Sequence, residues 1–214
     1  MGKIIVLIGA PGAGKGTQAR LIQERRGIPQ ISTGDMFREM KSSSTPLARE
    51  VQSIMAEGKL ISDDITYQIV RDRTSRDDCR NGYILDGYPR TAVQAKQLEE
   101  LASEQGLQIQ AIEVDVPRDE LMRRLTGRRS CPVCGEIYNI YSKPPKVDGA
   151  CDLHPEAGLV HRSDDNEESV KTRLETYENS TKPLLDFYSV SNRLQKVSGT
   201  GNVEDIYSEI DKLV

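Results

Sequence analysis

Short runs of apolar residues alternate along this chain with stretches in which apolar residues recur at helical spacing. The apolar runs predict strands at 4–8, 83–85, 111–116 and 194–197. The helical spacing predicts helices at 17–26, 63–78, 91–105 and 118–125, and further helical structure at 165–188 and 203–213. Thr91 suits the start of a helix, and Gly106 and Gly127 suit the ends of two others. This alternation predicts an α/β fold, a parallel sheet with helices on both faces, with ligands bound at the carboxyl ends of the strands.

Two segments interrupt the alternation. Residues 32–61 carry two short helical patterns, 34–41 and 46–57, with no clear strand between them, and residues 127–165 are rich in turn-forming residues and cysteine. We therefore expect a core made of 1–31, 62–126 and 166–214, with 32–61 and 127–165 inserted into it. Insertions at the strand ends of such a sheet can act as moving lids.

The sequence from Gly9 to Thr17 reads Gly-Ala-Pro-Gly-Ala-Gly-Lys-Gly-Thr and directly follows the first apolar run. Its glycines let backbone N–H groups converge, and Lys15 and a helix N-terminus add positive charge. The pattern predicts a P-loop that holds the polyphosphate of a nucleotide, and hence a P-loop NTPase-type sheet. The general pattern has Ser or Thr after the lysine, whereas this chain has Gly16 there and Thr17 next. A plain glycine-rich turn is the alternative, and it leaves Lys15 unexplained.

A second element of a phosphate site follows the apolar run 83–85. Asp86 comes at its end, where P-loop proteins place the carboxylate that holds Mg²⁺, usually through water. Arg90 follows soon after and would bring a guanidinium to the mouth of the same cleft. The alternative for Asp86 is a carboxylate that only caps the next turn.

The cysteines of the 127–165 segment have the spacing of a metal site. Cys131 and Cys134 are separated by two residues, as are Cys151 and His154, and sixteen residues lie between the pairs. This pattern predicts a four-coordinate Zn²⁺ site, and four protein ligands leave no position for a substrate, so its role would be structural. Asp152 is an alternative fourth ligand, and disulfides are an alternative to the metal. Neither Cys79 nor His161 fits the pattern.

Length and charge exclude several classes of protein. The 214 residues fit one domain with insertions. A net charge of −4 and a pI near 5.4 give no basic field for nucleic acid or an anionic membrane. The N-terminal apolar run is too short for a membrane span or a signal peptide, so we expect a cytoplasmic protein. Nothing indicates an oligomer, and a monomer is the default expectation.

Together, these motifs resemble the adenylate kinase family. The stretches that carry the resemblance are 9–17, 32–38, 86–91, 127–129, 139–147 and 162–173. They occur in the family's order over essentially the whole chain, and Gly16 is the family's own variant of the P-loop. The resemblance implies reversible transfer of a phosphoryl group from MgATP to AMP, giving two ADP. The acceptor is already an anion, so this reaction needs bound cations and alignment rather than a general base.

The resemblance also implies roles for individual residues. The groups that act on the transferring phosphoryl are Lys15, Arg90, Arg128, Arg162 and Arg173. ATP would contact Gly12, Ala13, Gly14, Lys15, Gly16, Thr17, Arg124, Arg128, Ile137, Tyr138 and Gly201. AMP would contact Thr33, Arg38, Lys59, Leu60, Ile61, Gly87, Tyr88, Pro89, Arg90, Gln94, Arg162 and Arg173. Mg²⁺ would lie near Asp86 and Thr17.

Three further expectations concern particular side chains. Arg124 and Arg128 are four residues apart, so a helix that continued through both would place them on one face. Tyr138 is expected to pack near the ATP base or ribose. Gln94 favours adenine as the acceptor base, because its amide can both donate to and accept from an adenine edge.

Three rival functions remain from the residues. A kinase for another nucleoside monophosphate differs only in the acceptor. A zinc-ribbon protein that binds nucleic acid would use the cysteine pairs and the basic dipeptide at 128–129, but the acidic pI and the absence of tryptophan argue against it. A nucleotide-dependent switch without an acceptor site would leave Arg38, Arg90 and Gln94 unexplained.

Overall fold

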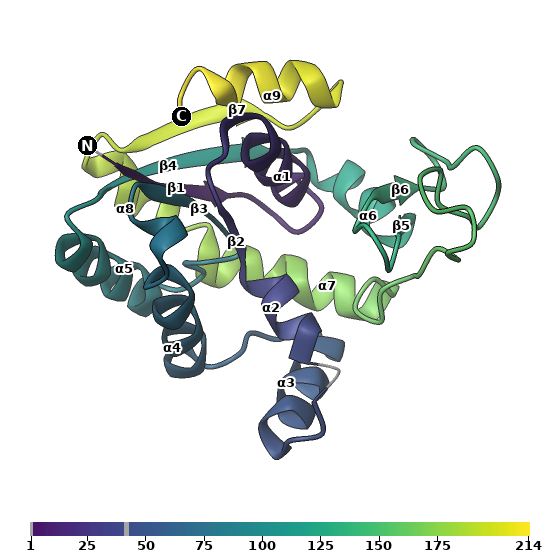
Figure 1. Ribbon diagram of the computed structural model, residues 1–214, viewed down its shortest axis with the longest axis horizontal. Helices are drawn as coiled ribbons and strands as arrows, with labels where there is room; N and C mark the ends of the chain where they lie inside the picture. The colour runs from purple at the N-terminus through teal and green to yellow at the C-terminus, as the bar shows by residue number, and fades with distance from the viewer. Residues whose placement is uncertain (1, 41–42) are drawn as a thin grey trace.

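The computed structural model describes residues 2–40 and 43–214. Five parallel strands form the central sheet in the order β2 (Gln30–Ser32), β3 (Gly82–Asp86), β1 (Lys3–Ile8), β4 (Gln108–Asp115) and β7 (Leu194–Ser198). Helices pack on both sides of this sheet (Figure 1). The predicted α/β fold is confirmed. Because β1 lies between β3 and β4, the loop that follows β1 emerges at the middle of the sheet's carboxyl edge.

The alternation of side chains along the buried strand β1 divides the core into two layers. Ile5 and Leu7 point into one cluster, together with residues of α1 (Lys15–Arg26), α6 (Arg118–Thr126), α7 (Glu167–Thr176) and α9 (Val203–Asp211). Ile4, Val6 and Ile8 point into the other, against α4 (Asp63–Thr74), α5 (Ala92–Gln105) and α8 (Leu184–Val190). All five side chains are at most 2% exposed. The core therefore holds the carboxyl edge of the sheet rigidly.

The predicted ends of the helices agree with the structure where a capping residue is present. The Thr91 side chain accepts a hydrogen bond from the backbone N–H of Gln94 and begins α5, and Gly106 ends it in the left-handed conformation. Gly127 ends α6 with a φ of −82°, so its helix end does not require glycine. A Cβ at Gly127 would instead lie 2.6 Å from a ring carbon of Tyr141, which explains the small residue.

Some elements differ from the sequence predictions. The edge strand β2 was not predicted, because three residues with a single apolar side chain carry too little signal. The helix expected at 63–78 ends at Thr74, and a 3₁₀ turn, η2 (Asp77–Cys79), follows it. The stretch 165–188 holds α7 and the start of α8, separated by the π-helical turn η3 (Tyr177–Thr181). No helix within the described residues is long and apolar enough to cross a bilayer.

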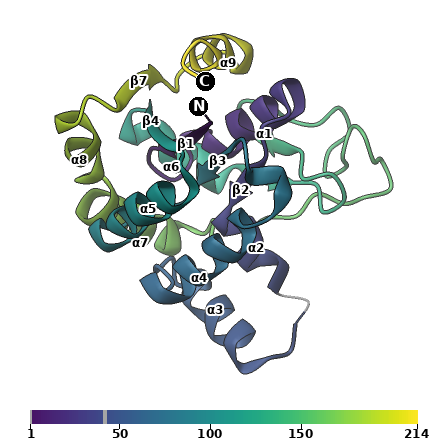
Figure 2. The ribbon, with the colours of Figure 1, turned by 60° about the vertical axis from the view of Figure 1, so that its left-hand side comes forward.

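The 32–61 segment forms α2 (Thr33–Glu39) and α3 (Pro46–Ala56), with no strand between them in the residues described there. The predicted end of the first helix at Lys41 lies outside the described residues. Phe37, Val51 and Ile61 give this segment a small core of its own. Helix α3 protrudes from the body of the protein (Figure 2), while Ser169 Oγ of α7 donates to the carbonyl of Ala56 at its end, 2.7 Å away.

The 127–165 segment projects from a different part of the molecule and consists mostly of loops (Figure 1). Its two short antiparallel strands are β5 (Arg128–Ser130) and β6 (Ile137–Asn139). Its buried cluster is small and is built largely from two cysteines, Tyr138 and Ala157. Such a cluster buries too little apolar surface to hold a fold by itself.

Candidate functional site

The loop between β1 and α1 has the conformation of a phosphate-binding turn. Gly12 and Gly14 adopt φ values of 86° and 97°, which side-chain-bearing residues rarely do, and Gly14 is the N-cap of α1. The first backbone N–H groups of α1 have no partners within the helix and are free for an anion. The Lys15 ammonium donates to the carbonyl oxygens of Gly9 and Ala10, at 2.7 and 3.1 Å. Burial, together with nearby arginines, lowers its pKa from 10.5 to about 8.

Asp86 lies next to the first turn of α1, as the sequence predicted for the end of its strand. A Cβ at Gly16 would stand 3.1 Å from Asp86 Oδ2, so glycine leaves room for the carboxylate close to the helix. Asp86 and Thr17 line the same cleft. A carboxylate and a hydroxyl in this place are the oxygen donors that Mg²⁺ prefers, and the residues fit a magnesium bound through water.

A single cleft of about 1590 Å³ extends from the P-loop to both inserted segments. It is lined by all six arginines that the family resemblance implied, which are Arg38, Arg90, Arg124, Arg128, Arg162 and Arg173. It is also lined by Leu60, Gly87, Pro89, Ile137, Gly201 and the P-loop residues 12–17. Residues separated by more than a hundred positions thus face one volume that is large enough for two nucleotides.

The arginines are packed closely enough to disfavour one another's charge. Burial, followed by repulsion from neighbouring guanidinium groups, lowers the pKa of Arg90 and of Arg173. The same causes lower the pKa of Arg162 to about 10. A guanidinium nevertheless stays protonated in proteins, so these arginines supply fixed positive charge. A concentration of fixed cations in a partly buried cleft is suited to a polyanion and is costly without one.

Asp165 compensates part of this charge and was not singled out from the sequence. Its side chain is fully buried and accepts two hydrogen bonds from Arg128, at 2.6 and 2.7 Å, and one from Arg173, at 2.9 Å. Burial acts to raise the pKa of Asp165, but these ion pairs hold it below its usual value. The sequence did offer a signal for this residue, because Asp164 and Asp165 form a pair of adjacent carboxylates close to Arg162.

Several predicted acceptor-site residues do not expose their side chains to the cleft. Ile61 belongs to the small core of the 32–61 segment, and Lys59 is exposed and pairs with Glu57. Tyr88 is 1% exposed, and its hydroxyl donates to the carbonyl of Gln94. Two further residues are each 2% exposed and use internal partners: Thr33 donates to the carbonyl of Gly87, and the amide of Gln94 bonds within the protein.

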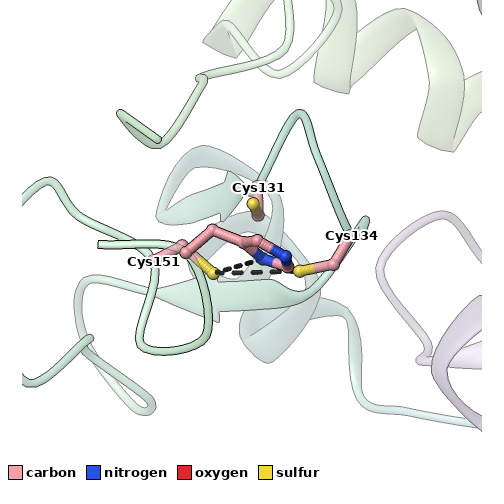
Figure 3. A group of neighbouring side chains, drawn as sticks. Cys131, Cys134 and Cys151 are labelled. Carbon is pink, nitrogen blue, oxygen red and sulfur yellow. Dashed lines mark hydrogen bonds between the residues drawn. The ribbon is translucent and has the colours of Figure 1, made fainter. Parts of the chain in front are cut away.

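The three cysteines of the 127–165 segment converge on one point (Figure 3). The ligand atoms of Cys131, Cys134, Cys151 and His154 all lie within 4.8 Å of one another. Two tight turns, each ending in a pair of ligands, bring these side chains together. Three soft sulfur donors and an imidazole fit a tetrahedral Zn²⁺. Burial opposes ionisation of Cys151, yet hydrogen bonds from Tyr138 and the Leu153 backbone lower the pKa of its thiol to about 6, as suits a metal ligand.

Comparison with known proteins agrees with this geometry. The adenylate kinase family model matches residues 7–193. The chain belongs to the adenylate kinase family. It is 48% identical to the adenylate kinase of Bacillus subtilis, over 98% of this chain and 97% of that protein. It is 47% identical to the adenylate kinase of Thermodesulfovibrio yellowstonii over 96% of each chain, and equally similar to that of Clostridium perfringens, over 98% of this chain and 97% of the relative.

The family's activity applies to this chain, because the match spans nearly its full length. It is an ATP:AMP phosphotransferase that converts ATP and AMP to two ADP. The rival interpretations, a zinc-ribbon protein that binds nucleic acid and a nucleotide switch without an acceptor site, are therefore set aside.

Arg124 and Arg128 lie on different elements, so the condition for a shared helix face is not met. The helix does not continue through Arg124 and Arg128, because α6 ends at Thr126 and Arg128 begins β5. Arg124 instead donates to the carbonyl of Gly199 and pairs with Glu120, both at 3.0 Å. The two guanidinium groups reach the same cleft from different elements.

Tyr138 borders the cleft but directs its ring into the cysteine cluster. It is 2% exposed, its hydroxyl lies 3.5 Å from Cys151 Sγ, and the same oxygen accepts from the backbone N–H of Asp152. The side chain thus supports the metal-site fold and leaves little surface for the ATP base or ribose that it was expected to contact.

Proposed function

We propose that the single cleft holds MgATP on the P-loop side and AMP on the side of the 32–61 segment, with the phosphates aligned end to end. The observation that carries the proposal is the convergence of the P-loop and the six arginines on one volume. Two polyanions repel each other, so bringing them together requires fixed positive charge that costs no reorganisation during the reaction. The reaction needs little covalent chemistry from the protein beyond this.

On the donor side, the backbone of Gly12–Thr17 surrounds the β- and γ-phosphates, and Lys15 reaches them. Asp86 and Thr17 hold Mg²⁺, which neutralises phosphate charge when it is bound. Arg124, Ile137 and Gly201 border the base and ribose, and Tyr138 supports this wall of the cleft from the cysteine cluster.

On the acceptor side, Arg38 and Arg90 bind the AMP phosphate, with Arg128, Arg162 and Arg173 on the transferring group. The planar fork of arginine pairs two phosphate oxygens at once, which fixes orientation as well as charge. Leu60, Gly87 and Pro89 line the cleft on this side and border the AMP base and ribose. Thr33, Lys59, Ile61, Tyr88 and Gln94 belong to the same acceptor side, and their contact with AMP requires the site to close over it.

The two inserted segments act as mobile subdomains in this proposal. The 32–61 segment closes over AMP, and the 127–165 segment closes over ATP and brings Arg128 and Arg162 to it. Closure excludes water that would hydrolyse ATP and screen the charges. A structural Zn²⁺ on Cys131, Cys134, Cys151 and His154 keeps the second segment rigid, so that its arginines arrive in a reproducible place. The protein is proposed to work as a cytoplasmic monomer, which sedimentation of the purified chain tests directly.

One assay tests the proposed sites. AMP, CMP, UMP and GMP are compared as acceptors of a phosphoryl group from MgATP, for the native chain and for Lys15→Gln. We expect strong preference for AMP, and loss of turnover with every acceptor in the variant. Lys171→Gln is the matched control, because Lys171 is exposed on α7. Full turnover by Lys15→Gln would overturn the assignment of the P-loop.

A further inference from the structure

The side-chain amide of Gln94 is held at both of its ends. Its Oε1 accepts a hydrogen bond from the backbone N–H of Arg90 at 2.7 Å, and its Nε2 donates to Oδ1 of Asp63 at 2.8 Å. Gln94 is 2% exposed, so water does not compete freely for these bonds. The first contact ties the amide to the loop that carries Arg90, and the second ties it to the first residue of α4.

The chemistry of the two partners determines which way the amide points. A backbone N–H can only donate, so the atom facing Arg90 has to be the oxygen. An ionised carboxylate can only accept, so the atom facing Asp63 has to be the NH₂ group. Rotating the amide by 180° would place two donors together at one end and two acceptors at the other. The orientation is therefore set twice, once by the backbone and once by Asp63.

Asp63 is well placed to accept hydrogen bonds. It lies in the first turn of α4, where the helix dipole stabilises negative charge. Its Oδ1 also accepts from the hydroxyl of Thr91 at 2.9 Å. In the described part of the chain, no lysine, arginine or histidine forms an ion pair with it, so its hydrogen-bonding capacity is directed to Gln94 and Thr91.

Once the site closes on AMP, an amide held in this way offers a defined pair of groups to the base. Oε1 keeps one lone pair and Nε2 keeps one hydrogen, since each uses only half of its capacity internally. Adenine presents a donor at its 6-amino group and an acceptor at N1, which match an oxygen and an NH₂ in this order. Hypoxanthine presents the reverse, an acceptor at O6 and a donor at N1. A rotated amide would therefore match hypoxanthine instead of adenine.

We propose that Asp63 is a positioning residue for base selection: by fixing the orientation of the Gln94 amide, it makes the acceptor site select AMP over IMP. Asp63 need not touch the nucleotide. The inference rests on the proposed role of Gln94 at the AMP base, and the test below separates the two.

The test compares kcat/KM for AMP and for IMP as acceptors with saturating MgATP, in the native chain and in Asp63→Asn, Asp63→Ala, Asp64→Asn and Gln94→Leu. Asparagine keeps the shape of Asp63 but can present either a donor or an acceptor, so the AMP-to-IMP ratio should fall about fivefold; with alanine it should fall tenfold or more. The loss should appear as a raised KM for AMP, with kcat largely kept. Asp64→Asn removes an equal charge from the same helical turn, at an exposed side chain, and should leave the ratio unchanged.

The outcomes distinguish the alternatives. A lowered ratio in Gln94→Leu and in Asp63→Asn, but not in Asp64→Asn, supports the proposal. A lowered ratio in Gln94→Leu with an unchanged ratio in Asp63→Asn overturns the role of Asp63 and leaves Gln94 in place. An unchanged ratio in Gln94→Leu overturns the role of Gln94 itself, and the inference with it. Melting temperatures identify any variant that fails to fold, and the isosteric asparagine variant then carries the test.

Discussion

Arg20 of helix α1 and Glu136 of the 127–165 segment form an ion pair, with 2.7 Å between Nη2 and Oε2. Their side chains are 25% and 21% exposed, so solvent screens the pair only in part. Arg20 is on the helix that the P-loop begins, and Glu136 directly precedes β6 in the cysteine-bearing segment. The pair is thus a direct link between the rigid core and the segment that we propose to move.

Breaking this link should release the 127–165 segment. Glu136→Gln removes about 1 kcal/mol of attraction, because partly exposed pairs are worth little more. We expect a raised KM for ATP and a kcat that is unchanged or up to a few-fold higher if opening limits turnover. The salt dependence of KM measured for both proteins checks this. Lys143→Gln is the control, because Lys143 pairs with Glu136 from within the same segment. Equal effects of both substitutions would contradict a link to the core.

The pKa of Lys15 predicts opposite effects of pH on activity and on stability. In the free enzyme, the ammonium is lost above about pH 8, so kcat/KM for ATP should fall about tenfold per pH unit there. Bound phosphate favours the ammonium, and kcat at saturating ATP should stay level to a higher pH. The unfolded chain keeps this proton to about pH 10.5. Between about pH 8 and 10.5 the unfolded state therefore binds more protons than the folded state, and the free energy of unfolding increases as pH rises. Lys15→Arg keeps its charge, and its profile should lack the fall near pH 8.

Asp165 should be a large stabilising contributor. Asp165→Asn leaves Arg128 without its carboxylate and Arg173 with Asp164 alone, at a cost of about 3 kcal/mol, or roughly 6–12 °C in Tm. The pKa of Asp165 is lowered in the folded protein, so its stabilisation is present above about pH 4 and is lost as pH falls further. Calorimetry at pH 7 and at pH 3 should show that the difference in Tm between the native chain and Asp165→Asn is smaller at pH 3. Asp77→Asn removes an exposed partner of Arg80, and its Tm should not change.

Arg162, in contrast to Asp165, should matter for the rate of the reaction and not for the stability of the fold. Arg162→Ala should lower kcat about 10³-fold, as for other arginines that neutralise a transferring phosphoryl group. Its Tm should stay level or rise, because burial and neighbouring cations already disfavour its charge in the folded protein. Arg118→Ala, at an exposed arginine of α6, should change neither quantity. A large fall in Tm together with kept activity would refute the role of Arg162.

Removal of the metal should affect stability more than chemistry. A chelator, or Cys134→Ser, should lower Tm, because the 127–165 segment buries few apolar side chains apart from its ligands. Turnover well below the transition should be largely retained, since four protein ligands leave no coordination position for substrate. Cys79→Ser should keep the full metal content, because Cys79 lies outside the cluster. Complete loss of turnover while the segment remains folded would show that the metal takes part in the reaction.

The local patterns were sufficient for four of the five strands of the sheet, the P-loop turn and the convergence of the three cysteines with His154. A strand of five apolar residues, a glycine-rich turn with a lysine, and two pairs of ligands separated by two residues are each defined within a few positions, and short spacing dictates their geometry. Strand β2 was not predicted, because its pairing with β3, rather than its own composition, makes it a strand. The helix predicted at 118–125 was close, since α6 ends at Thr126, but the conditional shared face of Arg124 and Arg128 does not occur because Arg128 already belongs to the hairpin of β5 with β6.

The chain's linear order already specified the family, its reaction and the residue types that this reaction requires. Only the folded arrangement decided which carboxylates pair with which arginines and amides. Asp165 between Arg128 and Arg173, Glu136 on Arg20, and Asp63 on the Gln94 amide are contacts across 8 to 116 positions. Ionic and amide contacts of this kind have no periodicity and no fixed spacing. They arise where the sheet and its two insertions bring distant side chains within hydrogen-bonding distance, and that distance is a property of the tertiary structure alone.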